Sequence, residues 1–500
     1  MKTLLKGFVA DGINEPSRMA VLVENDRIIA VEKELYGSCV ADKIYSFKDE
    51  IIAPGFIDVH GHSDISILAC PGAESKRRQG VTCEITGNCG LSPFPLTGKN
   101  REHLEHLYAN YGIPLTWENF PEYKQTLADK KVNLRTFSLC GHNTLRAAVA
   151  AYDTQELSPK QKLEMAVLLE KNLAAGAKGL STGLLYTPGC FADADEITDL
   201  MRILAKYNAV YATHLRSEGD HLVESLQETL DAALASGLTK LQISHLKTAG
   251  KDNWHKLDEV LELINQYRNE GIDIRFDRYP YVESQTMLSV ILPPPFDTMP
   301  DRDITIALQD EAAREKVRNS LKNRPESDWS RWRLTGTNHP EWRKFIGKKY
   351  TEIPGNKVEA VIEQLTFDAT TATIGAAGMS ENNMLKIINH PLCMPGTDGN
   401  ALPESTCFGT AHPRAFGAVA KLIRLKLDSG CSIGQAVKCV SSSPADFFNL
   451  ENIGTLQTGK KADITVFSPD DIDSDADFID PHRFAKGITM TMLDGIAEFY

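Results

Sequence analysis

The chain has 500 residues, a formal net charge of −13 and a hydrophobic fraction of 42%. This acidic balance argues against a nucleic-acid partner, because phosphate binding requires a basic face. No apolar run approaches the roughly 18 residues of a membrane span, and the charged start does not resemble a signal peptide. Ten unclustered cysteines do not indicate a disulfide framework. We therefore predict a cytoplasmic globular protein with neither nucleic acid nor membrane as a partner.

Both ends of the chain predict short β-strands. Residues 19–34, "MAVLVENDRIIAVEKE", contain two apolar runs around a turn at Glu24, Asn25 and Asp26. Residues 454–469 and 487–500 repeat this pattern near the C-terminus. Two β-rich ends around a different middle predict one small β-sandwich domain, built from residues 1–54 and from the C-terminal part of residues 416–500.

The middle of the chain alternates between apolar runs and helix-length amphipathic segments, which predicts a parallel α/β fold. In one such segment, Ser158 is the expected helix N-cap, Pro159 the first helical residue and Gly176 the C-cap. We predict a (β/α)8 barrel over residues 55–415, with residues 416–500 adding its last helix region. An open doubly wound sheet is the alternative, although no Gly-x-Gly-x-x-Gly motif opens a helix. The eight candidate strands lie within residues 51–60, 80–89, 133–142, 177–183, 209–215, 240–246, 273–281 and 391–399.

One charged segment, residues 296–353, interrupts the alternation and is predicted to be an insertion between two late strands. It contains Trp329, Trp332 and Trp342, three of the five tryptophans. The segment is either a surface excursion or a lid whose aromatic side chains cover a site.

Metal-binding residue types follow or end several of the candidate strands. His60 and His62 point to the same face of a strand, because residues i and i+2 do so. In a barrel, all strand C-termini meet at one rim, and that rim holds the active site. One such residue alone predicts little, but together the set indicates a zinc site. Its members are His60, His62, Cys89, His214, His245 and Asp398, with His142 as a possible supporting group.

These residues lie in motifs that resemble the N-acyl-D-amino-acid deacylases, or D-aminoacylases, of the amidohydrolase superfamily. The resemblance runs nearly end to end, and "GNCG" is its most specific part, since this branch uses a cysteine where many amidohydrolases use a carboxylated lysine. The matching motifs are "PGFIDVHGHSD", "GVTCEITGNCGLSP", "GHNTLR", "STGLLYTPG", "THLRSEG", "ISHLK", "DRYPY", "GMSENNM", "PGTDG", "HPRAFG" and "GKKADITVF".

The resemblance implies a zinc-dependent hydrolase that cleaves the amide of an N-acyl-D-amino acid, a small-molecule substrate, into a carboxylate and a free D-amino acid. It implies one tightly bound zinc on Cys89, His214 and His245. A second, weaker position would use His60 and His62 with Asp398 nearby, and Asp398 would act as general base and acid. It further implies that the substrate carboxylate meets Lys247, Tyr279 and Arg414, and that Leu185 and Gln285 line the side-chain pocket.

Two residues depart from the family's pattern. Lys178 lies where the wider superfamily can carry its bridging lysine, so a carboxylated Lys178 is an open alternative. Asn143 replaces a usual glycine, and we expect only a local backbone effect. A relative that acts on cyclic amides or isoaspartyl dipeptides would need the lysine bridge. A noncatalytic barrel would be expected to have lost ligands that are all present here.

The sequence favours apolar over acidic substrate side chains. The run "MLSVILPPPF", residues 287–296, adds apolar surface and no basic residue to the predicted pocket. A second substrate carboxylate would need a cation there, because an unpaired buried charge is costly. Arg331 or Arg333 of the insertion could supply that cation.

Overall fold

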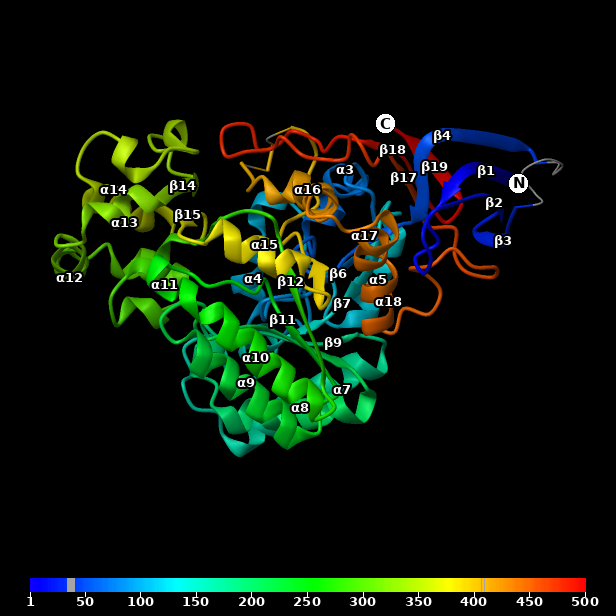
Figure 1. Cartoon of the computed structure of the whole chain (residues 1–500). Helices are drawn as coiled ribbons and strands as arrows, with labels where there is room; N and C mark the ends of the chain where they lie inside the picture. The colour runs from blue at the N-terminus through cyan, green and yellow to red at the C-terminus, as the bar shows by residue number, and fades with distance from the viewer. Residues whose placement is uncertain (34–40, 406, 409) are drawn as a thin grey trace.

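The structure is a computed structural model that describes residues 1–33, 41–405, 407–408 and 410–500. A central barrel has a β domain on one side, where the two termini lie, and a separate unit on the other (Figure 1). Within the described residues, no helix is both long and apolar enough to cross a membrane.

The β domain is a β-sandwich domain built on one seven-stranded sheet, with strands from both ends of the chain. Its centre pairs Ile52 of the N-terminal part with Val466 of the C-terminal part. The predicted turn contains Asn25 at φ +54°, whereas Glu34 lies outside the described residues. The prediction of one domain from both termini is confirmed. In sheet order its strands are β19 (Ile496–Phe499), β18 (Ile488–Leu493), β17 (Ile464–Phe467), β4 (Lys43–Pro54), β1 (Lys2–Val9), β2 (Ser17–Glu24) and β3 (Arg27–Glu32).

The predicted barrel is confirmed, and each of the eight candidate runs supplies its strand. All neighbouring barrel strands pair in parallel. The ring closes where Val59 N donates to Pro395 O at 3.0 Å and where Leu139 N donates to Thr86 O at 2.8 Å. In chain order the strands are β5 (Phe56–Asp58), β6 (Val81–Thr86), β7 (Arg135–Ser138) with its continuation β8 (Cys140–Gly141), β9 (Gly179–Gly183), β10 (Val210–His214), β11 (Lys240–Ile243), β12 (Asp273–Arg278) and β16 (Cys393–Pro395).

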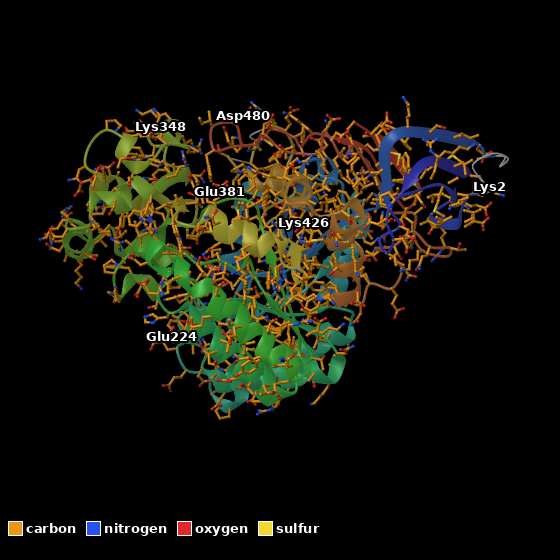
Figure 2. All side chains as sticks on the ribbon, viewed as in Figure 1. Lys2, Glu224, Lys348, Glu381, Lys426 and Asp480 are labelled. Carbon is orange, nitrogen blue, oxygen red and sulfur yellow. The ribbon has the colours of Figure 1, made fainter. Side chains whose placement is uncertain are left out.

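Helices surround this ring, and side chains fill the space between ribbons (Figure 2). The predicted cap of α7 is present, since the Ser158 side chain accepts from Gln161 N and Pro159 opens the helix. The helix ends at Ala174, and Gly176 follows at φ +103°. Among the described residues, the α-helices outside the insertion are α2 (Ser66–Ala69), α3 (Glu74–Arg77), α4 (Arg101–Leu107), α5 (Phe120–Asp129), α6 (His142–Ala150), α7 (Pro159–Ala174), α8 (Ala194–Tyr207), α9 (Leu222–Ser236), α10 (Leu257–Asn269), α15 (Glu381–Asn389), α16 (Arg414–Asp428), α17 (Ile433–Val440) and α18 (Ser442–Phe447).

The segment predicted as an insertion lies within a larger unit that has a hydrophobic core of its own. Trp329 and Trp332 are buried in that core with their ring centroids 5.2 Å apart. The hypothesis that these two rings cover the active site is therefore wrong. The unit consists of a three-stranded antiparallel sheet of β13 (Glu283–Met287), β15 (Thr373–Ala377) and β14 (Trp332–Gly336), with α11 (Asp301–Ala307), α12 (Glu311–Leu321), α13 (Glu326–Arg331) and α14 (Lys357–Asp368).

Candidate metal centre and active site

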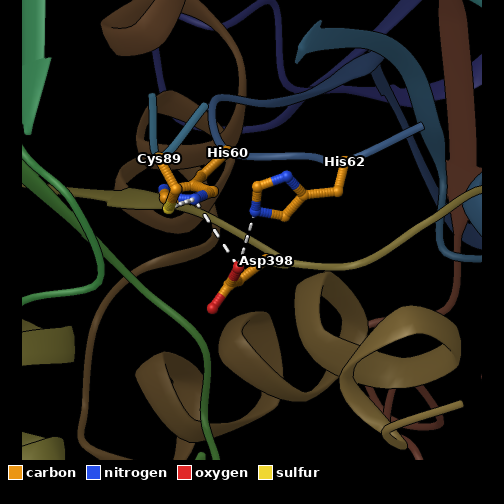
Figure 3. Close-up of side chains that lie close together, drawn as sticks. All are labelled: His60, His62, Cys89 and Asp398. Carbon is orange, nitrogen blue, oxygen red and sulfur yellow. Dashed lines mark hydrogen bonds and ion pairs between the residues drawn. The ribbon is translucent and has the colours of Figure 1, made fainter. Parts of the chain in front are cut away.

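Four of the predicted ligands form one compact cluster, drawn in Figure 3. His60 Nε2 lies 3.3 Å from Cys89 Sγ and 3.6 Å from Asp398 Oδ1, and His62 Nε2 lies 3.0 Å from the same oxygen. All donor atoms of the cluster lie within 4.8 Å of one another. Nitrogen and sulfur ligands held at 2.0–2.3 Å on a tetrahedral zinc would be roughly 3.5 Å apart, so the spacing fits a metal ion.

A second cluster shares Cys89 and adds His214, which ends β10, and His245, which follows β11. Cys89 Sγ lies 3.5 Å from His245 Nε2, and the donor atoms of Cys89, His214 and His245 lie within 4.8 Å of one another. Neither ring nitrogen of the buried His214 makes a hydrogen bond to a described residue, and its Nε2 lies 3.6 Å from Glu218 Oε2, beyond hydrogen-bonding distance. A buried imidazole rarely lacks hydrogen-bonding partners, so a metal ion at this position would satisfy it. The donor set fits zinc in both clusters.

The charges of the site favour a bound cation. Burial alone would raise the pKa of the Cys89 thiol, but His60 and His245 hold it well below its usual value. Burial alone would lower the pKa of His62, whereas its hydrogen bond to Asp398 and the neighbouring Cys89 raise it to about 9. A thiolate and carboxylates packed among imidazoles attract protons, and they attract a metal ion for the same reason.

Three of the ligands adopt backbone conformations that are rare outside glycine. Cys89, His245 and Asp398 have φ values of +51°, +36° and +50°. A residue other than glycine with such a φ raises the free energy of the folded state, so the conformation persists only where the surrounding structure holds it. Backbone strain of this kind is typical of functional sites. Each of these turns follows its barrel strand and aims its side chain across the rim.

Two acidic residues that the sequence analysis missed contact the predicted ligands. Asp277 lies 3.2 Å from His60 Nδ1 and accepts from His245 N at 3.0 Å. Glu218 Oε1 lies 2.8 Å from His245 Nδ1, and Lys247 Nζ lies 2.8 Å from the same nitrogen. Carboxylates commonly fix the tautomer of metal-binding histidines in this way. Asp277 lies in the motif "DRYPY" and Glu218 in the motif "THLRSEG", but nothing in the sequence distinguished them from exposed acidic residues.

The predicted carboxylate-binding residues all lie beside the clusters. Arg414 Nη1 is 2.8 Å from Asp398 Oδ2, and the Arg414 guanidinium lies over the Tyr279 ring at 4.7 Å. Lys247 Nζ donates to Glu218 Oε1 at 2.5 Å. The Tyr279 hydroxyl is buried and has no hydrogen-bond partner among the described residues, so it is available to a ligand.

One cavity of about 390 Å³ joins these groups to the two residues predicted for the side-chain pocket. Leu185 and Gln285 both line it, and Gln285 belongs to β13 of the insertion unit. Asn143 also lines the cavity, and its side-chain nitrogen donates to Gly183 O at 3.3 Å and Tyr186 O at 3.1 Å. The expectation of a purely local backbone effect at Asn143 is therefore wrong. Met287, from the apolar run predicted for the pocket, also lines it, and lining residues that the sequence analysis missed include His103, Leu107, Tyr152 and Asp301.

Two other hypotheses about supporting residues are not borne out. Lys178 immediately precedes β9, so it lies at the strand end opposite the metal ligands, and its Nζ donates to Asn449 O at 3.3 Å. A carboxylated Lys178 cannot bridge the clusters from there. His142 pairs with Glu196 at 2.8 Å and does not line the cavity.

Comparison with known proteins places this site in a family. Models of the amidohydrolase family match residues 46–292 and residues 370–497. N-acyl-D-glutamate deacylase from Alcaligenes xylosoxydans xylosoxydans is 30% identical over 99% of this chain and 92% of its own length. D-aminoacylase from the same organism is 31% identical over 98% of this chain and 93% of its own length.

A solved structure extends the likeness to three dimensions. N-acyl-D-glutamate deacylase from Bordetella bronchiseptica, in complex with zinc and a phosphonate mimic of the tetrahedral intermediate, superposes with a TM-score of 0.82. It is 28% identical, and the match covers 99% of this chain and 96% of that one. With the metal-ligand clusters at the barrel rim, these likenesses show that the chain belongs to the N-acyl-D-amino-acid deacylase, or D-aminoacylase, family of metal-dependent amidohydrolases.

Proposed function

We propose that this protein is a zinc-dependent deacylase that hydrolyses N-acyl-D-amino acids to a carboxylate, such as acetate, and a free D-amino acid. One observation carries the proposal: the two metal-ligand clusters share a cavity with Arg414, Tyr279 and Lys247. An amide bound there can place its carbonyl at the metal donors while its α-carboxylate meets cations. The D configuration rests on the relatives, which act on D-amino acid derivatives by name.

The residues of the site have separate roles in the proposed reaction. A zinc ion on these donors would lower the pKa of a bound water to about 7 and polarise the acyl carbonyl. Asp398 takes the proton of the attacking water and returns it to the departing amine. Arg414 offers parallel donors to the substrate carboxylate, and Tyr279 adds a neutral donor. We propose one tightly held zinc on Cys89, His214 and His245, with a second, weaker position at His60 and His62.

The cyclic-amide and isoaspartyl dipeptide alternatives gain no support. They require a bridging lysine, and Lys178 donates to Asn449 O at the other end of β9. Cys89 instead belongs to both donor clusters and can serve as the shared ligand.

The proposal is tested by comparing an N-acetyl-D-amino acid with its α-carboxamide analogue. We expect the wild type to prefer the free acid strongly, because a hydrated carboxylate binds only where charge-assisted hydrogen bonds offset its desolvation. Arg414→Ala should lose most of this preference, and the loss should appear in kcat as well as KM, because the carboxylate orients the amide. The measurement is kcat and KM for both compounds in both proteins.

Arg414→Lys is the matched variant, because it keeps the charge and loses the planar pair of donors. It should remain impaired relative to wild type. Equal hydrolysis of acid and carboxamide by the wild type would remove the free-acid substrate from the proposal. A slow reaction on the L enantiomer under the same conditions supports the assignment of configuration, and an equal rate contradicts it.

We further propose that the substrate side chain is apolar. Arg414 and Lys247 are the only arginine and lysine that line the cavity in the part of the chain that the structure describes, and both lie beside the metal ligands. Of the two insertion arginines, Arg333 pairs with Glu283 at 3.0 Å and Arg331 donates to Ala377 O. Burial lowers the pKa of His103 to about 4, so its imidazole is neutral at pH 7.

The cavity wall also carries a carboxyl group that would repel an acidic side chain. Burial raises the pKa of Asp301 to about 6, and Ser289 Oγ donates to its Oδ1 at 2.5 Å. We expect N-acetyl-D-leucine or N-acetyl-D-methionine to exceed N-acetyl-D-glutamate by at least about 100-fold in kcat/KM, or about 2.7 kcal/mol. Asp301→Asn should reduce this ratio about tenfold, since one like charge disappears.

Asp303→Asn on the same helix is the matched control, because Asp303 is exposed and does not line the cavity. Asp301 is charged above a pH of about 6, so discrimination in the wild type should be full at pH 8 and weaker at pH 5. The pH dependence of the ratio should vanish in Asp301→Asn. A wild type that prefers N-acetyl-D-glutamate would refute the apolar assignment and leave the deacylase assignment intact.

A further inference from the structure

A fully buried lysine lies behind the first metal-ligand cluster, outside the cavity. Lys76, in the short helix α3, has no exposed side-chain surface. Its Nζ donates to Asp58 Oδ2 at 2.7 Å, to Thr397 Oγ1 at 2.7 Å and to Gly399 O at 2.9 Å. An ammonium group has three donors, and these partners use all of them.

The partners of Lys76 hold the two segments that carry the ligands. Asp58 Oδ1 accepts from His60 N at 3.1 Å and from Thr397 N at 3.0 Å. Gly399 O accepts from His62 N at 3.0 Å, and Asp398 N donates to His60 O at 2.7 Å. The residues on both sides of Asp398 are therefore fixed against the strand end of the two histidines.

A second acid completes the network and explains the glycine between the two histidines. Glu84 lies 3.3 Å from Lys76 Nζ and accepts from Ser63 Oγ at 2.8 Å. Ser63 Oγ in turn accepts from Ala401 N at 2.7 Å. A Cβ atom at Gly61 would lie 1.5 Å from Glu84 Oε1, so only glycine fits where the carboxylate approaches.

We propose that Lys76 is a positioning residue, which fixes the Asp398 turn against the His60–His62 strand end without touching metal ligands or cavity. Asp398 has a φ of +50°, so its turn needs such support. Displacement of a catalytic group by about 1 Å can cost a factor of about 100 in rate. The catalytic part of this inference rests on the proposed function, whereas the metal-binding part does not.

The test begins with Lys76→Met. We expect kcat about 100-fold lower, KM within about threefold of wild type, and zinc lost from the weaker position before the tighter one. Zinc content measured against rising zinc concentration reports the metal independently of turnover. Because the single variant leaves Asp58 and Glu84 buried without their cation, it can fail to fold.

The double variant Lys76→Met with Asp58→Asn keeps the inference falsifiable. It removes one charge of each sign, and the asparagine oxygen can still accept from the His60 and Thr397 amides, but the link to Gly399 O is lost. We expect kcat and the weaker zinc to remain impaired. Wild-type kcat and zinc binding in the double variant would mean that Lys76 only neutralises charge, and would overturn the inference.

Arg135→Met is the matched control. Arg135 pairs with Asp463 at 2.8 Å at the start of β7, the barrel end opposite the ligands. It should lower thermal stability without changing kcat or the zinc titration, which separates a general folding defect from a positioning defect. If the wild type does not hydrolyse N-acetyl-D-amino acids but the zinc titration responds to Lys76 as expected, the proposed function fails and the metal-binding part of the inference stands.

Discussion

Replacement of Asp398 by alanine should lower kcat by a factor of roughly 10² to 10⁴, the usual contribution of a general acid–base group. The carboxylate lies 3.0 Å from His62 Nε2 and 2.8 Å from Arg414 Nη1, at the edge of the donor cluster. Burial alone would raise the pKa of Asp398, but Arg414 and the hydrogen bond with His62 hold it well below its usual value. The group is therefore ionised at neutral pH and ready to accept a proton from water.

The measurement is kcat with an N-acetyl-D-amino acid, together with zinc content and the melting temperature. Asp398→Asn is the matched variant, because it keeps the shape of the side chain and removes its basicity. Both variants should retain the zinc of the Cys89, His214 and His245 cluster, to which Asp398 does not belong. Turnover within tenfold of wild type in either variant would require a different base.

Replacement of Cys89 by alanine should remove both bound zinc and turnover. Its sulfur is the one donor that belongs to both clusters, 3.3 Å from His60 Nε2 and 3.5 Å from His245 Nε2. Without the thiolate, each cluster loses its sulfur ligand and a negative charge. Because the metal-binding free energy falls with each lost ligand, we expect substoichiometric zinc and activity near background.

Cys83→Ala is the matched control for this variant. Cys83 is also buried, but it lies within β6 in a hydrophobic cluster and belongs to neither donor set. It should keep zinc and turnover while losing some stability to the cavity that the substitution creates. Normal zinc and a normal rate in Cys89→Ala would end the hypothesis of a shared cysteine ligand.

The barrel and the grouping of the candidate metal ligands were predictable from sequence because they depend on local patterns. A buried parallel strand is a short apolar run, and eight such runs were visible along the chain. The parallel order then sends every strand C-terminus to one rim, so His60, Cys89, His214 and Asp398 could be grouped without coordinates. The zinc assignment followed from the chemistry of imidazole, thiolate and carboxylate.

The limits of the insertion were less predictable, because its outer strands look like ordinary barrel connections. Strands β13 and β15 pair although they lie far apart in the sequence. The side chain of Gln285 in β13, for example, donates to Thr373 Oγ1 in β15, 88 residues away. Such pairing depends on distant partners rather than on local sequence. The tryptophans showed that the segment has something to bury, but only the fold revealed that Trp329 and Trp332 bury each other.

The sequence by itself determined the fold class, the metal-binding residue types and the family resemblance, because strand hydrophobicity and motif spacing are local properties. The tertiary structure decided which charges act together. Asp277, Glu218 and Lys76 are ordinary charged residues in the sequence, yet each contacts residues of other elements. The hydrogen-bond partners of Lys76 lie 18 to 323 positions away, and Asp277 and Glu218 both contact His245, which follows a different strand. Long-range packing sets these contacts. The bounds of β9 put Lys178 just before its strand, at the barrel end opposite the predicted metal ligands.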